Sequence, residues 1–334
     1  MKKRRIGKGG ASASVVGFGG WAIGGWPRDG SDEGVALETL QAGIDAGVNF
    51  IDTAPANGFG LAESLVGKAI AGRARDELVI ASKCGLRWDR ESEHLHAECG
   101  GRRLFRTLAA DSVREELSRS LERLGTDWID LYQTHWPDPA TDIGAVVDVM
   151  ESLRQDGLIR QWGMCNTSAD TVMAALATGE PSSCQDRYSL LDRDQESELV
   201  PLCREQGLAF LARSPLAQEL LGGRIDGRRD FPEGDPRRDN PRFAPRVRDA
   251  LQAILAPVKA VARDHDISTA ELVLAWTLQQ NGVTHILADA RTPEQASANA
   301  NAGVIELDQE ELDVMQQAAD AWPGFAALQA TDGG

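Results

Sequence analysis

Hydrophobic and polar positions along the chain follow two alternating patterns. Short apolar runs, such as "ELVIASK" and "LAFLARSP", alternate with longer amphipathic segments, such as "EGVALETLQAGIDAG" and "ADSVREELSRSLERLG". Short apolar runs bounded by turn residues are typical of buried strands, and amphipathic segments closed by glycine are typical of surface helices. We therefore expect strands and helices to alternate along most of the chain.

Eight strand–helix units are predicted in this way. The strands are expected in "SVVGFGG", "VNFIDT", "ELVIASK", "WIDLYQTH", "IRQWGMCN", "SSCQ", "LAFLARSP" and "VTHILADA". Such alternation favours a parallel sheet, and eight units in 334 residues predict a closed (β/α)8 TIM barrel spanning residues 1–334 as one domain. The alternative is an open doubly wound sheet, but "GFGGWAIGG" lacks the glycine spacing of a dinucleotide-binding turn.

Several segments are expected to add to this barrel. The N-terminal "RRIGKGGASASVV" predicts a small hairpin across the barrel bottom, and residues 246–265 and 269–280 predict a pair of helices. Two long polar loops, residues 87–107 and 222–245, interrupt the alternation. Long loops in compact domains are usually functional or disordered, so we expect both over the C-terminal face of the barrel.

Charge and composition limit the partners. The net charge of −16 disfavours nucleic acids and anionic membranes, because their phosphates would be repelled. No run of 18 apolar residues and no secretory signal are present, so we expect a cytoplasmic protein without membrane contact. The five scattered cysteines form no C-x-x-C motif and are expected to be reduced thiols. The cluster "HLHAEC" is expected to be solvated loop, so we predict no metal site.

The predicted strand ends carry most of the candidate chemistry. Active sites of such barrels lie at the C-terminal ends of the strands. Asp52, Lys83 and His135 end or follow three consecutive strands, so their side chains should converge. A partly buried lysine needs a counter-charge, which Asp52 can provide, and His135 can orient a substrate oxygen or relay a proton. We therefore predict a catalytic cluster there.

These residues lie within motifs that resemble the aldo-keto reductases over nearly the full length, close to their bacterial general-stress and inositol-cluster branch. The matching motifs are "GVNFIDTAPANGFGLAESLVGKA", "VIASKCG", "LGTDWIDLYQTHWPDP", "IRQWGMCN", "QDRYSLLDRD", "LARSPLAQELL" and "ARTPEQASAN". The resemblance implies a barrel that binds NADP or NAD across its C-terminal face. It also implies a catalytic tetrad of Asp, Tyr, Lys and His, with Asp52, Lys83 and His135 at three positions.

The fourth position of the tetrad holds Asn57 instead of tyrosine. In the family's reduction the tyrosine hydroxyl protonates the substrate oxygen. An amide donates hydrogen bonds but delivers no proton at neutral pH. Losing a general acid typically lowers a rate by about 10²–10⁴-fold. The resemblance therefore implies atypical or weakened redox chemistry.

The resemblance also implies a set of cofactor-binding positions that run from the nicotinamide to the adenosine. Glu219 stands where glycine is usual, so a carboxylate is expected near the ligand's phosphates. Asp289 beside the ribose would favour NAD over NADP, because it accepts from a 2′-hydroxyl and repels a 2′-phosphate. The full set is Trp21, Asn166, Gln185, Tyr188, Ser214, Leu216, Gln218, Asp289, Arg291, Gln295 and Asn299.

Three functions remain open at this stage. The first is a nicotinamide-dependent oxidoreductase acting on a carbonyl or alcohol. The second is a non-redox dehydratase, lyase, isomerase or cyclase that uses Lys83 or His135 as acid or base with little or no cofactor. The third is a binding module, which the cluster at the strand ends disfavours. Any substrate is a small molecule, and tryptophans expected at the pocket, namely Trp21, Trp26, Trp88 and Trp136, would suit a large or cyclic one. No pattern indicates an oligomeric state.

Overall fold

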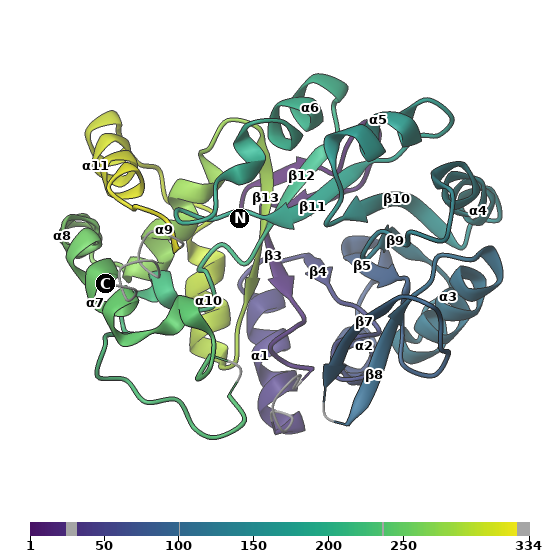
Figure 1. Cartoon of the computed structure of the whole chain (residues 1–334), viewed down its shortest axis with the longest axis horizontal. Helices are drawn as coiled ribbons and strands as arrows, with labels where there is room; N and C mark the ends of the chain where they lie inside the picture. The colour runs from purple at the N-terminus through teal and green to yellow at the C-terminus, as the bar shows by residue number, and fades with distance from the viewer. Residues whose placement is uncertain (25–31, 100, 236, 326–334) are drawn as a thin grey trace.

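The centre of the molecule is a closed barrel of eight parallel strands (Figure 1). The computed structural model describes residues 1–24, 32–99, 101–235 and 237–325. Each barrel strand pairs with the next in chain order, and the last pairs with the first, which confirms the predicted TIM barrel. The strands are β3 (Val16–Gly19), β4 (Phe50–Asp52), β5 (Val79–Cys84), β9 (Ile129–Thr134), β10 (Ile159–Cys165), β11 (Ser183–Arg187), β12 (Ala209–Arg213) and β13 (Val283–Asp289).

Helices surround the strands (Figure 1). They are α1 (Glu33–Asp45), α2 (Leu61–Ile70), α3 (Ala110–Leu124), α4 (Ile143–Gln155), α5 (Ala169–Leu176), α6 (Leu199–Gln206), α7 (Pro245–Ile254), α8 (Ala256–Asp264), α9 (Thr269–Leu278), α10 (Pro293–Asn301) and α11 (Gln309–Asp320). The helix expected over residues 246–265 is in fact two helices, α7 and α8, which meet at Leu255. Pro257 lies in the first turn of α8, where its missing N–H ends the continuous ladder of helical hydrogen bonds.

The N-terminal hairpin is confirmed at the bottom of the barrel. Strands β1 (Lys3–Arg5) and β2 (Ser12–Ser14) pair in antiparallel fashion. Ile6, in the turn between them, is buried in one cluster with Phe50, Leu131 and Leu211 from three barrel strands. Because Phe50 is the first residue of β4, this cluster lies toward the N-terminal ends of the strands. The hairpin therefore covers the end of the barrel away from the predicted site.

Residues 87–107 were expected to form a long polar loop, and this prediction was wrong, because the segment forms strands. The segment forms an antiparallel sheet of β6 (Leu86–Arg87), β8 (Arg102–Arg106) and β7 (Leu95–Cys99), in that order. Leu95 pairs with Phe105, and the buried Leu104 packs with Leu86 and Ala56 in a small apolar cluster. Leu104 and its neighbour Phe105 are both buried, so apolar contacts hold the hairpin in place although most of its sequence is polar.

The second long segment, residues 222–245, keeps an irregular course in its described part, with a short 3-10 helix at Pro241–Phe243. It is anchored by Phe231 and Phe243, whose rings meet edge to face at 5.6 Å. Both belong to an apolar cluster that also contains Leu251 of α7 and Trp276 of α9. The segment therefore packs through its own side chains, as compact functional loops do. Within the described ranges, every helix is too short or too polar to cross a lipid bilayer.

Candidate active site

A cavity of about 520 Å³ is built on the C-terminal ends of the barrel strands. All four residues predicted to be catalytic, Asp52, Asn57, Lys83 and His135, line it. Asp52 is the last residue of β4, Lys83 is next to last in β5, and His135 follows β9 directly. Parallel strands that are neighbours in the barrel bring these side chains to one rim.

Lys83 and Asp52 form a buried ion pair. Lys83 Nζ lies 2.6 Å from Asp52 Oδ2 and also donates to the backbone oxygen of Thr53 at 3.0 Å. Only 4% of Lys83 and 6% of Asp52 is exposed, so neither charge is compensated by bulk water. An ammonium has three N–H groups, and these two bonds use two of them. The third N–H is therefore available to the cavity.

A layer of buried amides supports the other oxygen of Asp52. Gln133 and Gln185 each donate from Nε2 to Asp52 Oδ1 at 3.1 Å. Cys165 donates its thiol to Gln133 Oε1 at 3.6 Å, and burial raises the pKa of this thiol to about 12. Gln133 therefore orients the ion pair from beneath. It was not predicted from the sequence, although it precedes His135 by two positions and so lies on the same side of its strand.

His135 is held in its neutral form. Burial lowers the pKa of His135 well below its ordinary value of 6.5, and the positive charges of Lys83, Arg213 and His96 lower it further. The backbone N–H of His135 donates to Cys84 O at 2.8 Å, which ties the residue to the end of β5. A neutral imidazole can donate from one nitrogen and accept at the other. His135 can therefore orient a substrate oxygen without adding a charge.

Asn57 lies in the turn between β4 and α2, with 6% of its surface exposed. The turn is tight because Gly58 and Gly60 both have positive φ, at 66° and 97°. Gly24 packs directly on the Asn57 backbone, where an added Cβ would lie 2.7 Å from the carbonyl carbon. The backbone N–H of Asn57 donates to Ala54 O at 3.1 Å, whereas its side-chain amide has no hydrogen-bond partner among the described residues. The amide therefore remains available to a ligand in the cavity.

Several of the nicotinamide-binding positions implied by the resemblance lie at the cavity, and their role in binding stays a prediction. Asn166 and Gln185 line the cavity, with Trp21 on its wall. Asn166 has φ of 54°, and its side chain donates to His135 O at 2.8 Å and accepts from Arg213 Nη2 at 2.5 Å. Gln185 uses its Nε2 for Asp52, and its Oε1 has no partner within the described part of the chain. A carboxamide N–H would find an acceptor there.

The segment after β12 forms a second wall. Ser214, Leu216 and Gln218 line the cavity as expected, and so does Glu219. Ser214, Gln218 and Glu219 all have positive φ, at 55°, 56° and 79°. Non-glycine residues in this region carry a backbone cost that surrounding contacts must offset.

At the far end, Asp289, Arg291 and Gln295 line the cavity. Asn299 does not line it, but donates from Nδ2 to the backbone oxygen of Asp289 at 3.0 Å and so supports that residue from behind. Arg291 and Gln295 are joined by a bond of 2.9 Å from the Arg291 N–H to Gln295 Oε1, at the start of α10.

Tyr188 is not brought to the cavity. It is buried in the core, donates its hydroxyl to Glu196 Oε1 at 2.6 Å and meets the Phe210 ring edge to face. Its stacking on a nicotinamide ring therefore stays a prediction. Among the tryptophans, Trp21 and Trp136 line the cavity, Trp88 packs on Phe59, and Trp26 lies outside the described residues.

The β7–β8 hairpin contributes a residue that the sequence suggested only as part of an overhanging loop. His96 lines the cavity, its ring lies 5.0 Å from that of Trp136, and its Nδ1 accepts from Arg106 Nε at 3.2 Å. Arg213 and Arg237 are two further lining residues that were not predicted. The sequence offered one signal for Arg213: it is a charged residue at the C-terminal end of an apolar strand, where the site was expected.

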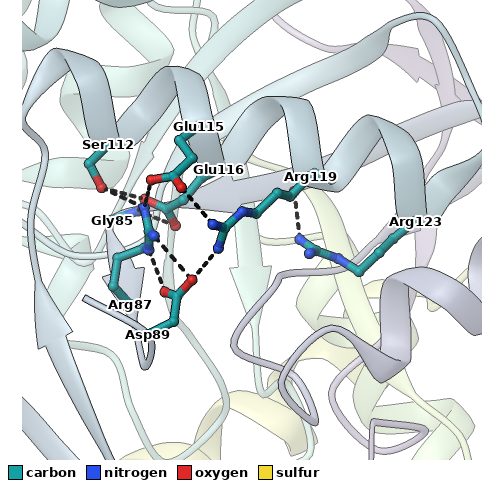
Figure 2. A network of polar contacts seen from close by, with 9 residues as sticks. Gly85, Arg87, Asp89, Ser112, Glu115, Glu116, Arg119 and Arg123 are labelled. Atoms are coloured by element: carbon teal, nitrogen blue, oxygen red, sulfur yellow. Dashed lines mark hydrogen bonds and ion pairs between the residues drawn. The ribbon is translucent and has the colours of Figure 1, made fainter.

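A polar network centred on the buried Arg87 and Glu116 supports the base of this hairpin (Figure 2). Both carboxylate oxygens of Glu116, on α3, accept from the backbone N–H of Gly85 at 3.1 Å. Arg87 donates to Asp89 and Glu115, and Arg119 on the same helix closes the network by binding Asp89. Burial raises the pKa of Glu116 to about 8. Because Gly85 lies two residues after Lys83, the network fixes the segment that leaves the candidate active site.

Comparisons with known proteins agree with this geometry. Residues 15–320 match the model of the aldo/keto reductase family. The NADH-specific methylglyoxal reductase of Escherichia coli K12 is 36% identical over 326 residues, covering 96% of this chain and 99% of that protein. The aldo-keto reductase YhdN of Bacillus subtilis is 35% identical, covering 89% and 87%. The solved structure of a glycerol dehydrogenase from Gluconobacter oxydans is 30% identical, covers 96% of both chains and has a TM-score of 0.87. The chain belongs to the aldo-keto reductase family of oxidoreductases.

Proposed function

We propose that this chain is an oxidoreductase that interconverts a carbonyl and an alcohol with a nicotinamide dinucleotide, and that its proton transfer is weakened by Asn57. The observation that carries the proposal is that Asp52, Lys83 and His135 line one cavity with Asn166 and Gln185. Three members of the implied tetrad and both carboxamide-binding positions therefore face the same space.

The residues present fit such a dinucleotide. Oε1 of Gln185, which has no partner among the described residues, suits a carboxamide N–H, and the cavity continues from there to Arg291 and Gln295 at the start of α10. Asp289, at the end of β13, can accept from a free ribose 2′-hydroxyl. The Escherichia coli relative is named as NADH-specific, which agrees with a preference for NAD over NADP.

The chain's own residues would handle the proton. Reduction adds a hydride to the carbonyl carbon and a proton to its oxygen, and the bound dinucleotide supplies the hydride. Lys83 lines the cavity and keeps one N–H beyond its bonds to Asp52 and Thr53, so it can protonate the oxygen and recover the proton from solvent. Asn57 and neutral His135 can donate hydrogen bonds that hold the same oxygen. Because Asn57 supplies no acidic proton in place of the family's tyrosine, we expect slow turnover.

The experiment is a titration of the purified protein with NADH and NADPH, followed by tryptophan fluorescence. Trp21 and Trp136 line the cavity and provide the signal. We expect saturable quenching by NADH at lower concentration than by NADPH, and none by adenosine as the control ligand. Absence of binding of either dinucleotide at millimolar concentration would rule out the dehydrogenase proposal.

A non-redox lyase, isomerase or cyclase is the second candidate. It is favoured by Asn57, because an amide delivers no proton at neutral pH and so does not serve the family's reduction, whereas Lys83 and His135 still line the cavity. In that case Lys83 would stabilise the developing oxyanion. Tight binding of either dinucleotide in the titration above would count against this candidate.

A further inference from the structure

Glu219 places a carboxylate between two guanidinium groups inside the cavity. Its Oε2 lies 2.7 Å from Arg237 Nη1, and its Oε1 lies 3.8 Å from Arg291 Nη1. All three residues line the cavity. Arg237 comes from the loop of residues 222–245, whereas Arg291 precedes α10. Two separate segments therefore converge on one acid.

Arg237 is held from behind by other groups. Its Nε and Nη2 donate to the two oxygens of Asp235 at 3.1 and 3.0 Å, and its guanidinium lies 4.7 Å from the centre of the Phe231 ring. This leaves Nη1 as the edge that binds Glu219. A guanidinium fixed in this way on one edge presents the other edge as a rigid anion site.

The two sides of the ion pair differ in exposure. The Arg237 side chain is 9% exposed and that of Asp235 is 1% exposed, whereas the Glu219 side chain is 48% exposed. Displacing Glu219 into water would cost little desolvation, whereas moving Arg237 would leave the carboxylate of Asp235 in the interior. Glu219 is therefore the partner that can leave.

The backbone at Glu219 has a conformation that favours glycine. Its φ is 79°, and the two residues before it, Ala217 and Gln218, also have positive φ at 46° and 56°. A side chain at such a position carries a steric cost, which the two ion pairs offset. The contribution of Glu219 to the cavity is therefore its negative charge, because its backbone conformation would suit glycine better.

We propose that Glu219 is a resident anion that occupies the binding site for a ligand phosphate, so that a phosphate-bearing ligand must displace it from Arg237 and Arg291. The inference rests on the proposed function, which supplies such a ligand in the diphosphate or 2′-phosphate of a nicotinamide dinucleotide. With Glu219 in place, the two arginines are balanced by Glu219 and Asp235, and the site attracts anions weakly. With Glu219 displaced, the same site carries an excess positive charge.

The test compares Glu219→Gln with the wild-type chain by calorimetric titration with NADH, NADPH and inorganic pyrophosphate. Glutamine keeps the length of the side chain and the backbone conformation and removes only the charge. We expect the dissociation constants to fall by about tenfold, the size of a modest change in one close charge pair. Glu306→Gln is the matched control, because Glu306 pairs with Lys2 on the exposed surface and its loss changes net charge equally. It should leave all three constants unchanged.

A second variant tests the site itself. Arg237→Met should weaken binding of the same ligands by about tenfold, and Glu219→Gln should add little in that background, because the two act through one contact. We also expect the binding of these ligands to depend less on salt concentration in Arg237→Met than in the wild type. NADH and NADPH separate the two phosphate sources, because only NADPH adds the 2′-phosphate.

The outcomes separate this inference from the proposed function. Equal constants for Glu219→Gln, Glu306→Gln and the wild type with every ligand would overturn the inference, even if the dinucleotides bind. If neither dinucleotide binds any variant, the proposed function fails. Tighter binding of pyrophosphate by Glu219→Gln would still support the resident anion in that case, and unchanged pyrophosphate binding would overturn it as well.

Discussion

Arg213 and Asn166 are joined by a hydrogen bond of 2.5 Å from Nη2 to Oδ1 at the mouth of the barrel. The bond links the last residue of β12 to the residue after β10, and Asn166 in turn donates to His135 O. Arg213 also lies 3.8 Å from Asp186. One arginine therefore sets both the position of the Asn166 amide and the charge around His135.

Replacing this arginine should raise the pKa of His135. Arg213 is among the charges that hold the pKa of His135 below 6.5, so Arg213→Met removes part of that effect. In the variant, the imidazole should become protonated at higher pH than in the wild type, as measured by NMR titration of the ring protons. Arg187→Met, at another arginine near Asp186, is the control. If the pKa of His135 is the same in Arg213→Met and the wild type, the charge of Arg213 does not affect the imidazole.

Restoring a phenol at position 57 should accelerate carbonyl reduction. Asn57→Tyr places a hydroxyl in the cavity beside the third N–H of Lys83, which can lower its pKa and make it a general acid. We expect kcat for an aldehyde such as methylglyoxal to rise by about 10²-fold. The measurement is loss of NADH absorbance, and Asn57→Phe, with the ring but no hydroxyl, should give no gain. Equal rates in Asn57→Tyr and Asn57→Phe would show that the missing tyrosine hydroxyl is not what limits carbonyl reduction.

Removing Lys83 should strongly destabilise the fold. Lys83→Met leaves the carboxylate of Asp52 buried with only two amide donors, and breaking a buried ion pair typically costs about 3–5 kcal/mol. Urea unfolding should show this loss, and the double variant with Asp52→Asn should recover part of it. Arg73→Met breaks an exposed pair with Asp45 and should cost less than about 1 kcal/mol. Similar losses in both single variants would contradict the assigned burial.

Glu116 should make the protein less stable at alkaline pH. Burial raises the pKa of Glu116 from 4.5 to about 8, so the folded state binds this proton more tightly than the unfolded state. Its stabilising contribution is complete below pH 4.5 and is lost as pH rises to about 8. A shift of this size corresponds to roughly 5 kcal/mol.

The measurement is urea unfolding at several pH values between 4.5 and 8. Glu116→Gln should flatten the fall in stability relative to the wild type, because glutamine does not titrate. Glu122→Gln, at an exposed position on the same helix, should keep the wild-type slope. If Glu116→Gln keeps that slope too, the carboxyl of Glu116 is not the group that titrates.

Much of the barrel could be predicted from local patterns. The period of apolar residues identifies each strand and helix separately, and the eightfold alternation leaves few ways to close a sheet. Residues at strand ends, such as Asp52 and Lys83, could be placed together because neighbouring parallel strands share one rim. Residues 87–107 could not be predicted as strands, because the pairing of Leu95 with Phe105 is visible only once the hairpin is packed.

The sequence by itself determined the order of the elements, the family motifs and the replacement of the tetrad tyrosine by Asn57. Apart from the pairing of Asp52 with Lys83, only the tertiary structure decided which charges meet. Arg213 binds Asn166 across 47 residues, and Arg237 binds Glu219 across 18 through a loop with no regular pattern. Pairing of this kind depends on where closure of the barrel brings separate loops, and the energy of a charge depends on its distance to partners and water. Neither quantity is encoded in any local stretch of residues.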